Sequence, residues 1–148
     1  HHPNIHRINV ESAEEMYQAA TAAYEDADAG ILCAAVADFT PECTADHKIK
    51  REKEDLVLRL KPTHDIAAAL GNSKRENQRL DEVAHAQDKL ARKNLDFIVL
   101  NSLNDKGAGF RCDTNKITII DRQNASTYPL KSKKEVAEDI IDKLVTLL

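Results

Sequence analysis

Hydrophobic residues recur along this chain at two spacings, one typical of helices and one typical of buried strands. Residues 13–23 carry apolar side chains on one side of a helix, and residues 136–148 repeat that pattern near the C-terminus. A third amphipathic pattern covers residues 82–93. A short helix is expected over residues 65–70, with Gly71 at its end. The spacing therefore predicts four helices.

Polar residues mark where three of these helices begin or end. Ser12 is followed three residues later by Glu15, and Ser132 is followed in the same way by Glu135. Each pair predicts a capping box, in which the two side chains satisfy N–H groups that the first helical turn leaves free. Asn94 follows a helix that ends in basic residues, and asparagine is one of the few residues that tolerates a left-handed cap.

Continuous apolar runs predict the strands. Residues 31–37, with the sequence ILCAAVA, and residues 97–100 are the clearest, because a strand covered on both faces has few polar positions. Further strands are expected at residues 5–10, 56–60, 116–120 and 127–130. The last two flank a turn at residues 121–124 and predict a β-hairpin late in the chain.

The alternation of helices and strands predicts an α/β fold. We expect a three-layer, Rossmann-like, mainly parallel sheet with helices on both faces and the late hairpin, built as one domain over residues 1–148. Ligands of such sheets bind beyond the carboxyl ends of the strands. Residues 35–40 and 101–113, which follow the two clearest strands, are therefore the segments where a site is expected.

Composition narrows the class of protein. The net charge of −4 argues against a general nucleic-acid binder, and no apolar run is long enough to cross a membrane. Three cysteines, Cys33, Cys43 and Cys112, stand far apart, in neither a disulfide framework nor a zinc pattern. These features predict a soluble protein of a reducing, cytoplasmic compartment.

Three groups of residues are candidates for binding chemistry. Small residues from Cys33 to Ala37 would let a ligand approach the backbone, and Asp38 would accept a hydrogen bond from a hydroxyl group or help to hold a cation. The basic run at residues 48–51 and the pair Lys89 and Lys93, four residues apart on one helix face, suit phosphate groups. An ordinary buried strand and solvated charged faces are the alternatives.

A fourth candidate is the turn at residues 62–65, which leads into the short helix. The N–H groups at the start of that helix could serve a ligand, or Thr63 and Asp65 could serve only to cap it. The glycine fingerprints of dinucleotide-binding and P-loop proteins are missing from the sequence. A bound nucleotide would therefore depend on lysines for its phosphates.

These segments together resemble one family. The stretches AAVADFTP, KIKRE, LKPTHDI, RKNLDFIVLNSL and GAGFRCDTNKITIID occur in this order from residue 34 to residue 121. They resemble the phosphopantothenate–cysteine ligase, or phosphopantothenoylcysteine synthetase, half of bacterial bifunctional coenzyme A biosynthesis proteins. The similarity covers most of the chain from about Ile5 onward, and it rests on the order and spacing of the segments together.

The resemblance implies a ligase that uses CTP with Mg²⁺ to join L-cysteine to 4'-phosphopantothenate. The phosphopantothenate carboxylate would attack the α-phosphate of CTP, and the cysteine amine would then displace CMP from the acyl-cytidylate. The family is generally dimeric. In the bifunctional form the ligase follows an FMN-dependent decarboxylase domain, and nothing in this chain resembles that flavin-binding half.

The resemblance also assigns roles to residues of this chain. The backbone near Cys33, Ala34 and Ala35 would read the cytidine, with Asp38 and Phe39 close by. Lys48 would act as the catalytic lysine and reach the phosphates from a mobile flap. The remaining nucleotide-binding residues would be His64, Asp65, Ile66, Ala67, Lys89 and Lys93. No residue is assigned to a protein-bound metal.

The sequence departs from the family pattern in two places. The family has a first strand, a phosphate-contacting loop and a helix that this chain lacks. It also has a strand before the helix that carries Lys89, and we expect no counterpart here because Leu80 runs straight into Asp81. Residues missing between those two positions would explain the second departure. Two alternatives are a catalytically incomplete dimerisation or scaffold fragment and another Rossmann-like nucleotide enzyme.

Overall fold

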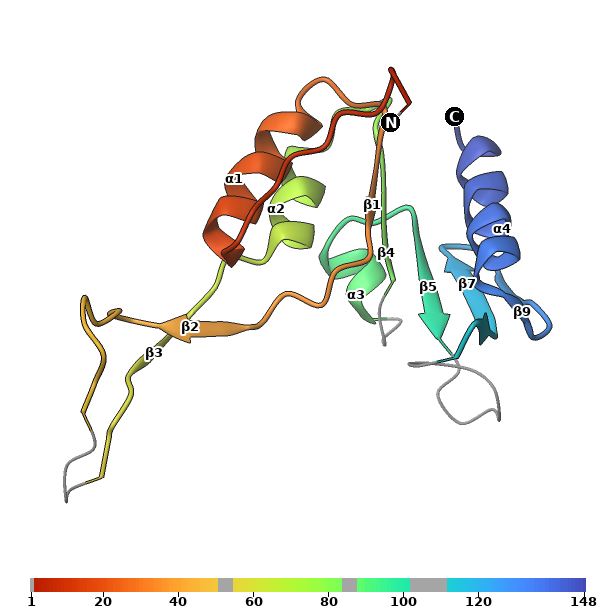
Figure 1. The fold of residues 1–148 in the computed structure, drawn as a ribbon. Helices are drawn as coiled ribbons and strands as arrows, with labels where there is room; N and C mark the ends of the chain where they lie inside the picture. The colour runs from red at the N-terminus through yellow and green to blue at the C-terminus, as the bar shows by residue number, and fades with distance from the viewer. Residues whose placement is uncertain (1, 51–54, 84–87, 102–111) are drawn as a thin grey trace.

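A mixed five-stranded sheet forms the centre of the protein. The computed structural model describes residues 2–50, 55–83, 88–101 and 112–148. The strand order is β1 (Ala29–Leu32), β4 (Arg79–Val83), β5 (Phe97–Asn101), β7 (Ile117–Asp121) and β8 (Ala125–Thr127). β1, β4 and β5 are parallel, whereas β7 and β8 run antiparallel to their neighbours (Figure 1). The predicted α/β class is confirmed, but the sheet is half antiparallel rather than mainly parallel.

Helices cover both faces of this sheet, as predicted. α1 (Ala13–Tyr24) and α2 (Ile66–Ser73) lie on one side, with the short α3 (Asp88–Arg92), and α4 (Lys133–Val145) lies on the other (Figure 1). Side chains of β5 alternate between the two cores. Ile98 packs with residues of α1 and α2, whereas Phe97 and Val99 pack with residues of α4.

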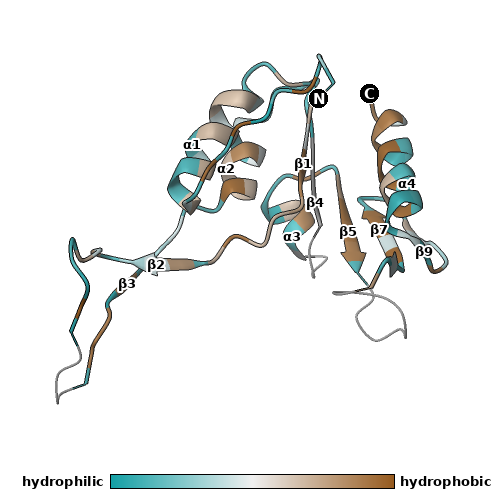
Figure 2. Ribbon diagram, viewed as in Figure 1, coloured by the Kyte–Doolittle hydropathy of each residue, from teal (hydrophilic) through white to brown (hydrophobic). Residues whose placement is uncertain are grey.

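The centre of the core is β5, one of the two strands that the sequence identified most clearly. Phe97, Ile98 and Val99 are fully buried, and β5 is hydrophobic along most of its length in Figure 2. Because β5 has a strand on each side and a helix layer on each face, it needs no polar side chain until Asn101. The predicted pattern of a doubly covered strand is therefore confirmed here.

Two other strand predictions are wrong, one in its bounds and one in its existence. The run at residues 31–37 forms a strand only as far as Leu32, and most of residues 33–37 are exposed. Residues 5–10 form no strand, and Ile5 and Ile8 are largely exposed. Apolar character marked both segments, but within the described part of the chain neither residues 33–37 nor residues 5–10 pair with a neighbouring strand.

The predicted helix over residues 82–93 is also wrong at its start. Arg79–Val83 is strand β4, paired with β1 on one side and β5 on the other, and the described helix is α3, Asp88–Arg92. Leu80 and Asp81 are neighbours within this strand, opposite Gly30 and Ile31. The strand that was expected to lack a counterpart is therefore present. Residues 84–87 lie outside the described part of the chain.

The predicted caps at Ser12, Ser132 and Asn94 are confirmed, but the helix end predicted at Gly71 is wrong. Ser12 and Ser132 each accept the N–H of the glutamate three residues on, and each glutamate carboxylate accepts the serine N–H in return. Asp65 caps α2, which runs past Gly71 to Ser73. Asn94 has the left-handed conformation expected of it, with φ of 50°. The late hairpin is present as β7 and β8, although β8 ends at Thr127.

An antiparallel arm projects from the body. β2 (Phe39–Pro41) pairs with β3 (Leu60–Pro62), and the described residues between them, 42–50 and 55–59, reach away from the sheet (Figure 1). The strand predicted at residues 56–60 is thus shifted to β3. A last pair, β6 (Thr114–Asn115) and β9 (Lys131–Ser132), lies before α4.

Candidate ligand-binding site

A cavity of about 580 Å³ opens beyond the carboxyl end of β1, bounded by residues of α1, the start of α2 and the region of α3. This is one of the two places where the sequence predicted a site. The second, residues 101–113, lies mostly outside the described part of the chain. The cavity is lined by Met16, Ala20, Ile31, Leu32, Cys33, Ala34, Ala35, Val36, Asp38, Thr63, His64, Asp65, Ile66, Ala67, Lys89 and Lys93.

The segment after β1 and the segment before α2 form one wall of this cavity. The Thr63 hydroxyl donates to the carbonyl oxygen of Ala37 at 2.6 Å, and the Thr63 N–H donates to the carbonyl oxygen of Asp38 at 2.9 Å. Thr63 thus joins two segments that are far apart in the sequence. Because Cys33, Ala34 and Ala35 have short side chains, a ligand can approach the backbone of this wall closely.

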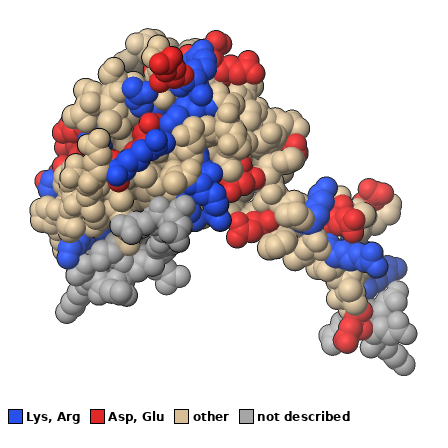
Figure 3. Space-filling view, turned by 180° about the vertical axis from the view of Figure 1, so that it is seen from behind, with Lys and Arg blue, Asp and Glu red and all other residues tan. Residues whose placement is uncertain are grey.

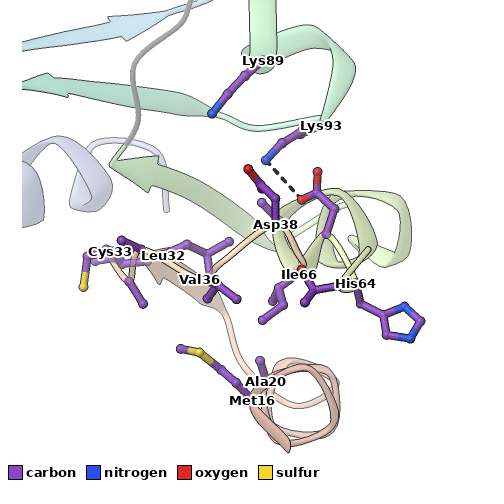
Figure 4. A pocket seen from close by; sticks show the side chains of 16 residues that line it. Met16, Ala20, Leu32, Cys33, Val36, Asp38, His64, Ile66, Lys89 and Lys93 are labelled. Carbon is purple, nitrogen blue, oxygen red and sulfur yellow. Dashed lines mark ion pairs between the residues drawn. The ribbon is translucent and has the colours of Figure 1, made fainter. Parts of the chain in front are cut away.

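Lysine side chains form the adjoining side, next to Asp65. Lys89 on α3 and Lys93 just after it both extend toward the cavity (Figure 4). The Lys93 Nζ atom lies 3.1 Å from Oδ1 of Asp65, and the Lys93 residue is 7% exposed. A cavity with two ammonium groups on one side suits an anionic ligand.

Asp65 has two partners at the start of α2. Its Oδ1 atom accepts the Ala68 N–H at 3.0 Å and also faces Lys93. Burial raises the pKa of the Asp65 carboxyl, but the Ala68 N–H and the Lys93 ammonium group outweigh that effect, and the pKa lies below its ordinary value. Asp65 is therefore charged at neutral pH, which keeps Lys93 at the edge of the cavity.

The far end of the cavity is apolar. Met16 and Ala20 line it from α1, Leu32 and Val36 from the end of β1 and the segment that follows, and Ile66 from α2. Figure 4 shows these side chains across the cavity from Lys89 and Lys93. The cavity can thus hold a molecule that has a compact ring at one end and negative charge at the other.

His64 lines the cavity, but its ring points away from it (Figure 4). The ring stacks on Tyr17, with 4.4 Å between centroids and 16° between planes, and Nε2 lies 3.4 Å from Oε2 of Glu14. These contacts hold the segment before α2 against α1. The imidazole is therefore placed to support the wall, and the rest of His64 faces the cavity.

All but two of the site residues predicted from the sequence line this cavity. The exceptions are Phe39, which is exposed on β2, and Lys48, which lies on the arm. Sequence reasoning missed Met16 and Ala20, because their helical stripe was assigned to the core alone. A signal was available, since the first turns of a helix that precedes a strand lie at the carboxyl edge of a parallel sheet.

Charge elsewhere is mixed. On the face seen in Figure 3, Lys and Arg side chains are interspersed with Asp and Glu.

Among the described residues there is no group of three or more histidine, cysteine or acidic side chains that could hold a metal ion. None of the described helices combines the length and the apolar character needed to cross a membrane. The three cysteines are free thiols.

Comparisons with known proteins agree on one family. The family described as "DNA/pantothenate metabolism flavoprotein C-terminal domain" matches residues 1–148. A protein of an unknown prokaryotic organism, named cysteine/cysteine sulfinic acid decarboxylase, has 53% sequence identity over an alignment that covers 98% of this chain. The coenzyme A biosynthesis bifunctional protein CoaBC of Bacillus subtilis (strain 168) is 40% identical to 95% of it.

This chain spans only part of these relatives, 43% of the first and 36% of the second. The alignment with the first covers 154 positions, which is longer than the chain, so some positions of that relative have no counterpart here. Among solved structures, the C-terminal domain of a coenzyme A biosynthesis bifunctional protein CoaBC matches with a TM-score of 0.77 and 34% identity. That match covers 95% of this chain and 66% of the other.

Proposed function

Because this chain belongs to the DNA/pantothenate metabolism flavoprotein C-terminal domain family, we propose that it is the nucleotide-binding part of a phosphopantothenate–cysteine ligase. The ligase would use CTP to join L-cysteine to 4'-phosphopantothenate in coenzyme A biosynthesis. The names of the CoaBC relatives and the similarity to a solved CoaBC C-terminal domain support this proposal. Decarboxylation with FMN would belong to a separate domain of the full-length protein.

The observation that carries the proposal is the division of the cavity into a charged side, where two lysines stand near Asp38 and Asp65, and an apolar end. Lys89 and Lys93 face the same space as Met16 and Val36. A nucleoside triphosphate has this layout, with a flat ring at one end and a polyanion at the other. The exposed backbone of residues 33–35 lies between the two ends, where N–H and C=O groups can hydrogen-bond to the edge of a ring.

The chemistry needs a site of this kind. A carboxylate is a poor acyl donor, and transferring a cytidylyl group to it provides a phosphate-ester leaving group. The phosphopantothenate carboxylate forms a bond to the α-phosphorus while the bond to pyrophosphate breaks. The cysteine amine then attacks the acyl carbon and CMP leaves. Lys89 and Lys93 would stabilise the negative charge that develops on the phosphate oxygens.

Mg²⁺ would arrive with the nucleotide and offset charge on its phosphates. This ion commonly binds through one or two carboxylates together with substrate phosphates. Asp38 at the cavity wall suits that role, whereas Asp65 already bonds to Ala68 and Lys93. The described residues thus fit a cation carried by CTP better than one held by the protein alone.

Lys48 can reach the nucleotide phosphates, as its proposed catalytic role requires, only if the arm folds over the cavity of this copy or of a second copy. In the structure it is exposed on the arm and lines no part of the cavity described above. The arm of this copy or of a second copy in a homodimer would bring Lys48 to the phosphates. Replacing Lys48 by alanine, with Lys50→Ala on the same arm as the matched control, tests this: only the first change should weaken CTP binding.

The parallel strands β1, β4 and β5, with the cavity beyond the end of β1, also support a Rossmann-like arrangement. Another nucleotide enzyme with this arrangement, or a fragment that only dimerises, would not select CTP. Calorimetric titration with CTP and Mg²⁺, repeated with ATP, separates these possibilities.

Variants sharpen that titration. We expect the chain to bind CTP more tightly than ATP, and we expect Lys89→Met to weaken CTP binding at least tenfold. Lys134→Met is the matched control, because it removes the same charge far from the cavity. The Lys134 side chain is 87% exposed on α4. A chain that binds neither nucleotide, or a Lys134 variant that weakens CTP binding as much as the Lys89 variant, would contradict the proposed site.

A further inference from the structure

We propose that Met16 determines which nucleobase the cavity accepts. This inference rests on the proposed function, and it adds a residue that the sequence pattern had assigned only to the core. Met16 lies on the second turn of α1, is partly buried, and extends into the cavity toward the segment after β1 (Figure 4). Ala20, one turn further along α1, lines the same end with a much smaller side chain.

The positions of the charges fix the direction in which a nucleotide lies. Lys89 and Lys93 stand on one side of the cavity, and Met16 and Ala20 stand across from them (Figure 4). Phosphates held by the two lysines leave the opposite end for the base. That end is bounded by Met16 and Ala20 on α1 and by Leu32 and Val36 on the other side. The Met16 side chain therefore limits the size of the base that fits there.

The chemistry of methionine suits this position. Its thioether is polarisable and contacts aromatic rings favourably, and its unbranched chain fills irregular space. A single methylene group in an apolar pocket changes discrimination between substrates by roughly 10- to 200-fold. With Met16 in place the apolar end fits a one-ring pyrimidine, and without it the space extends toward α1 and admits a two-ring purine.

Two opposite variants test this assignment by calorimetry on the whole chain, with CTP, ATP and inorganic tripolyphosphate as ligands. Met16→Ala should lower the ratio of CTP affinity to ATP affinity about tenfold. Ala20→Val narrows the same end and should raise that ratio by weakening ATP more than CTP. Met16→Leu, which keeps the volume, should leave the ratio within about twofold. Tripolyphosphate binding should stay unchanged in all three variants, because the lysines are untouched.

The outcomes distinguish this inference from the proposed function. If the wild-type chain binds neither nucleotide, the proposed function itself fails. If it prefers CTP but neither Met16→Ala nor Ala20→Val changes the ratio, only the role of Met16 is overturned. A Met16→Ala variant that loses tripolyphosphate together with both nucleotides would assign Met16 to the fold and would also overturn it. Should Met16→Ala not fold, the direction of the change in Ala20→Val decides.

Discussion

Lys93 and Asp65 meet at the edge of the cavity, where one carboxylate oxygen serves two partners. Oδ1 of Asp65 lies 3.1 Å from the Lys93 ammonium group and 3.0 Å from the N–H of Ala68. The same atom therefore caps helix α2 and holds the lysine that faces the cavity. The start of α2 and the position of the Lys93 ammonium group therefore depend on each other through this contact.

The two functions of Asp65 can be separated by substitution. Asparagine caps a helix about as well as aspartate, whereas alanine does not. Asp65→Asn thus removes the charge opposite Lys93 and keeps the cap, and Asp65→Ala removes both. We expect the alanine variant to be less stable than the asparagine variant by about 1 kcal/mol, measured as a shift in the urea unfolding midpoint. Equal midpoints would mean that the Ala68 bond contributes no stability.

Gly71 lets α2 approach the backbone of Lys93. A Cβ atom on Gly71 would lie 1.8 Å from the Lys93 carbonyl oxygen, and the Asn94 side chain donates to the Gly71 carbonyl oxygen at 3.0 Å. Gly71→Ala must push α2 away from this segment. Overpacking typically costs 1–3 kcal/mol, and because the contact is with backbone we expect at least about 3 kcal/mol.

This displacement should also reach the site. Since Lys93 is held between Gly71 and Asp65, we expect Gly71→Ala to weaken the binding of tripolyphosphate as well as to lower the urea midpoint. Asn72→Ala is the matched control, because Asn72 is exposed on the same helix. Its effect on stability should stay within about 0.5 kcal/mol. A Gly71 variant as stable as the Asn72 variant would show that the close approach is unimportant.

What the sequence allowed us to predict is mostly local. The capping boxes at Ser12 and Ser132 and the left-handed Asn94 depend on residues within one turn, and the structure confirms all three. β5 was also predictable, because a strand buried on both faces has a composition of its own. The rule that ligands bind after the ends of such strands pointed to Ala35, Val36 and Asp38. The other predicted residues of the cavity came from local charge patterns and from the family resemblance.

The errors come from pairing between distant segments. Arg79–Val83 forms β4 because β1 and β5 lie on either side of it, and no pattern within residues 82–93 reveals those neighbours. The run after β1 leaves the sheet at Cys33, and Thr63, far along the chain, bonds to Ala37 and Asp38. Met16 was missed for the same reason, since its distance from the ligand edge is set by the packing of α1.

Gln78 is a buried polar residue that joins α1 to the start of β4. Its amide nitrogen donates to the carbonyl oxygens of Tyr24 and Ala27, and its amide oxygen accepts the Arg75 N–H at 2.9 Å. Gln78 is 2% exposed, so leucine fits the apolar surroundings but loses all three bonds. We expect Gln78→Leu to destabilise the protein by about 2–4 kcal/mol.

Thermal unfolding followed by circular dichroism measures this loss. Gln18→Leu is the control, because Gln18 is exposed on α1 and bonds only locally, to Glu14 at 3.0 Å. That change should alter the free energy of unfolding by no more than about 0.5 kcal/mol. If the two leucine variants melt at the same temperature, the bonds of Gln78 do not stabilise the contact between α1 and β4.

Asp121 predicts how the stability of the protein changes in acid. It ends β7, where its carboxylate accepts a hydrogen bond from Lys143 on α4 at 2.7 Å and two more from the N–H groups of Gln123 and Asn124. The Lys143 bond, followed by the two backbone bonds, lowers the pKa of Asp121 from its ordinary 3.8 to about 2. The charged form is therefore favoured by folding.

The sign of the pH effect follows from this direction. A carboxyl group with a lowered pKa in the folded state contributes stability above its unfolded pKa and loses it as the pH falls toward the folded value. Asp121 should thus contribute on the order of 2 kcal/mol at neutral pH, and that contribution should disappear between about pH 4 and pH 2. Urea unfolding of the wild type and of Asp121→Asn across this range measures it. The two stabilities should converge as the pH falls, whereas Asp142→Asn, at an exposed position of α4, should follow the wild type throughout. If the free energies of unfolding of the wild type and Asp121→Asn differ by the same amount down to pH 2, the charge of the Asp121 carboxylate does not account for its contribution to stability.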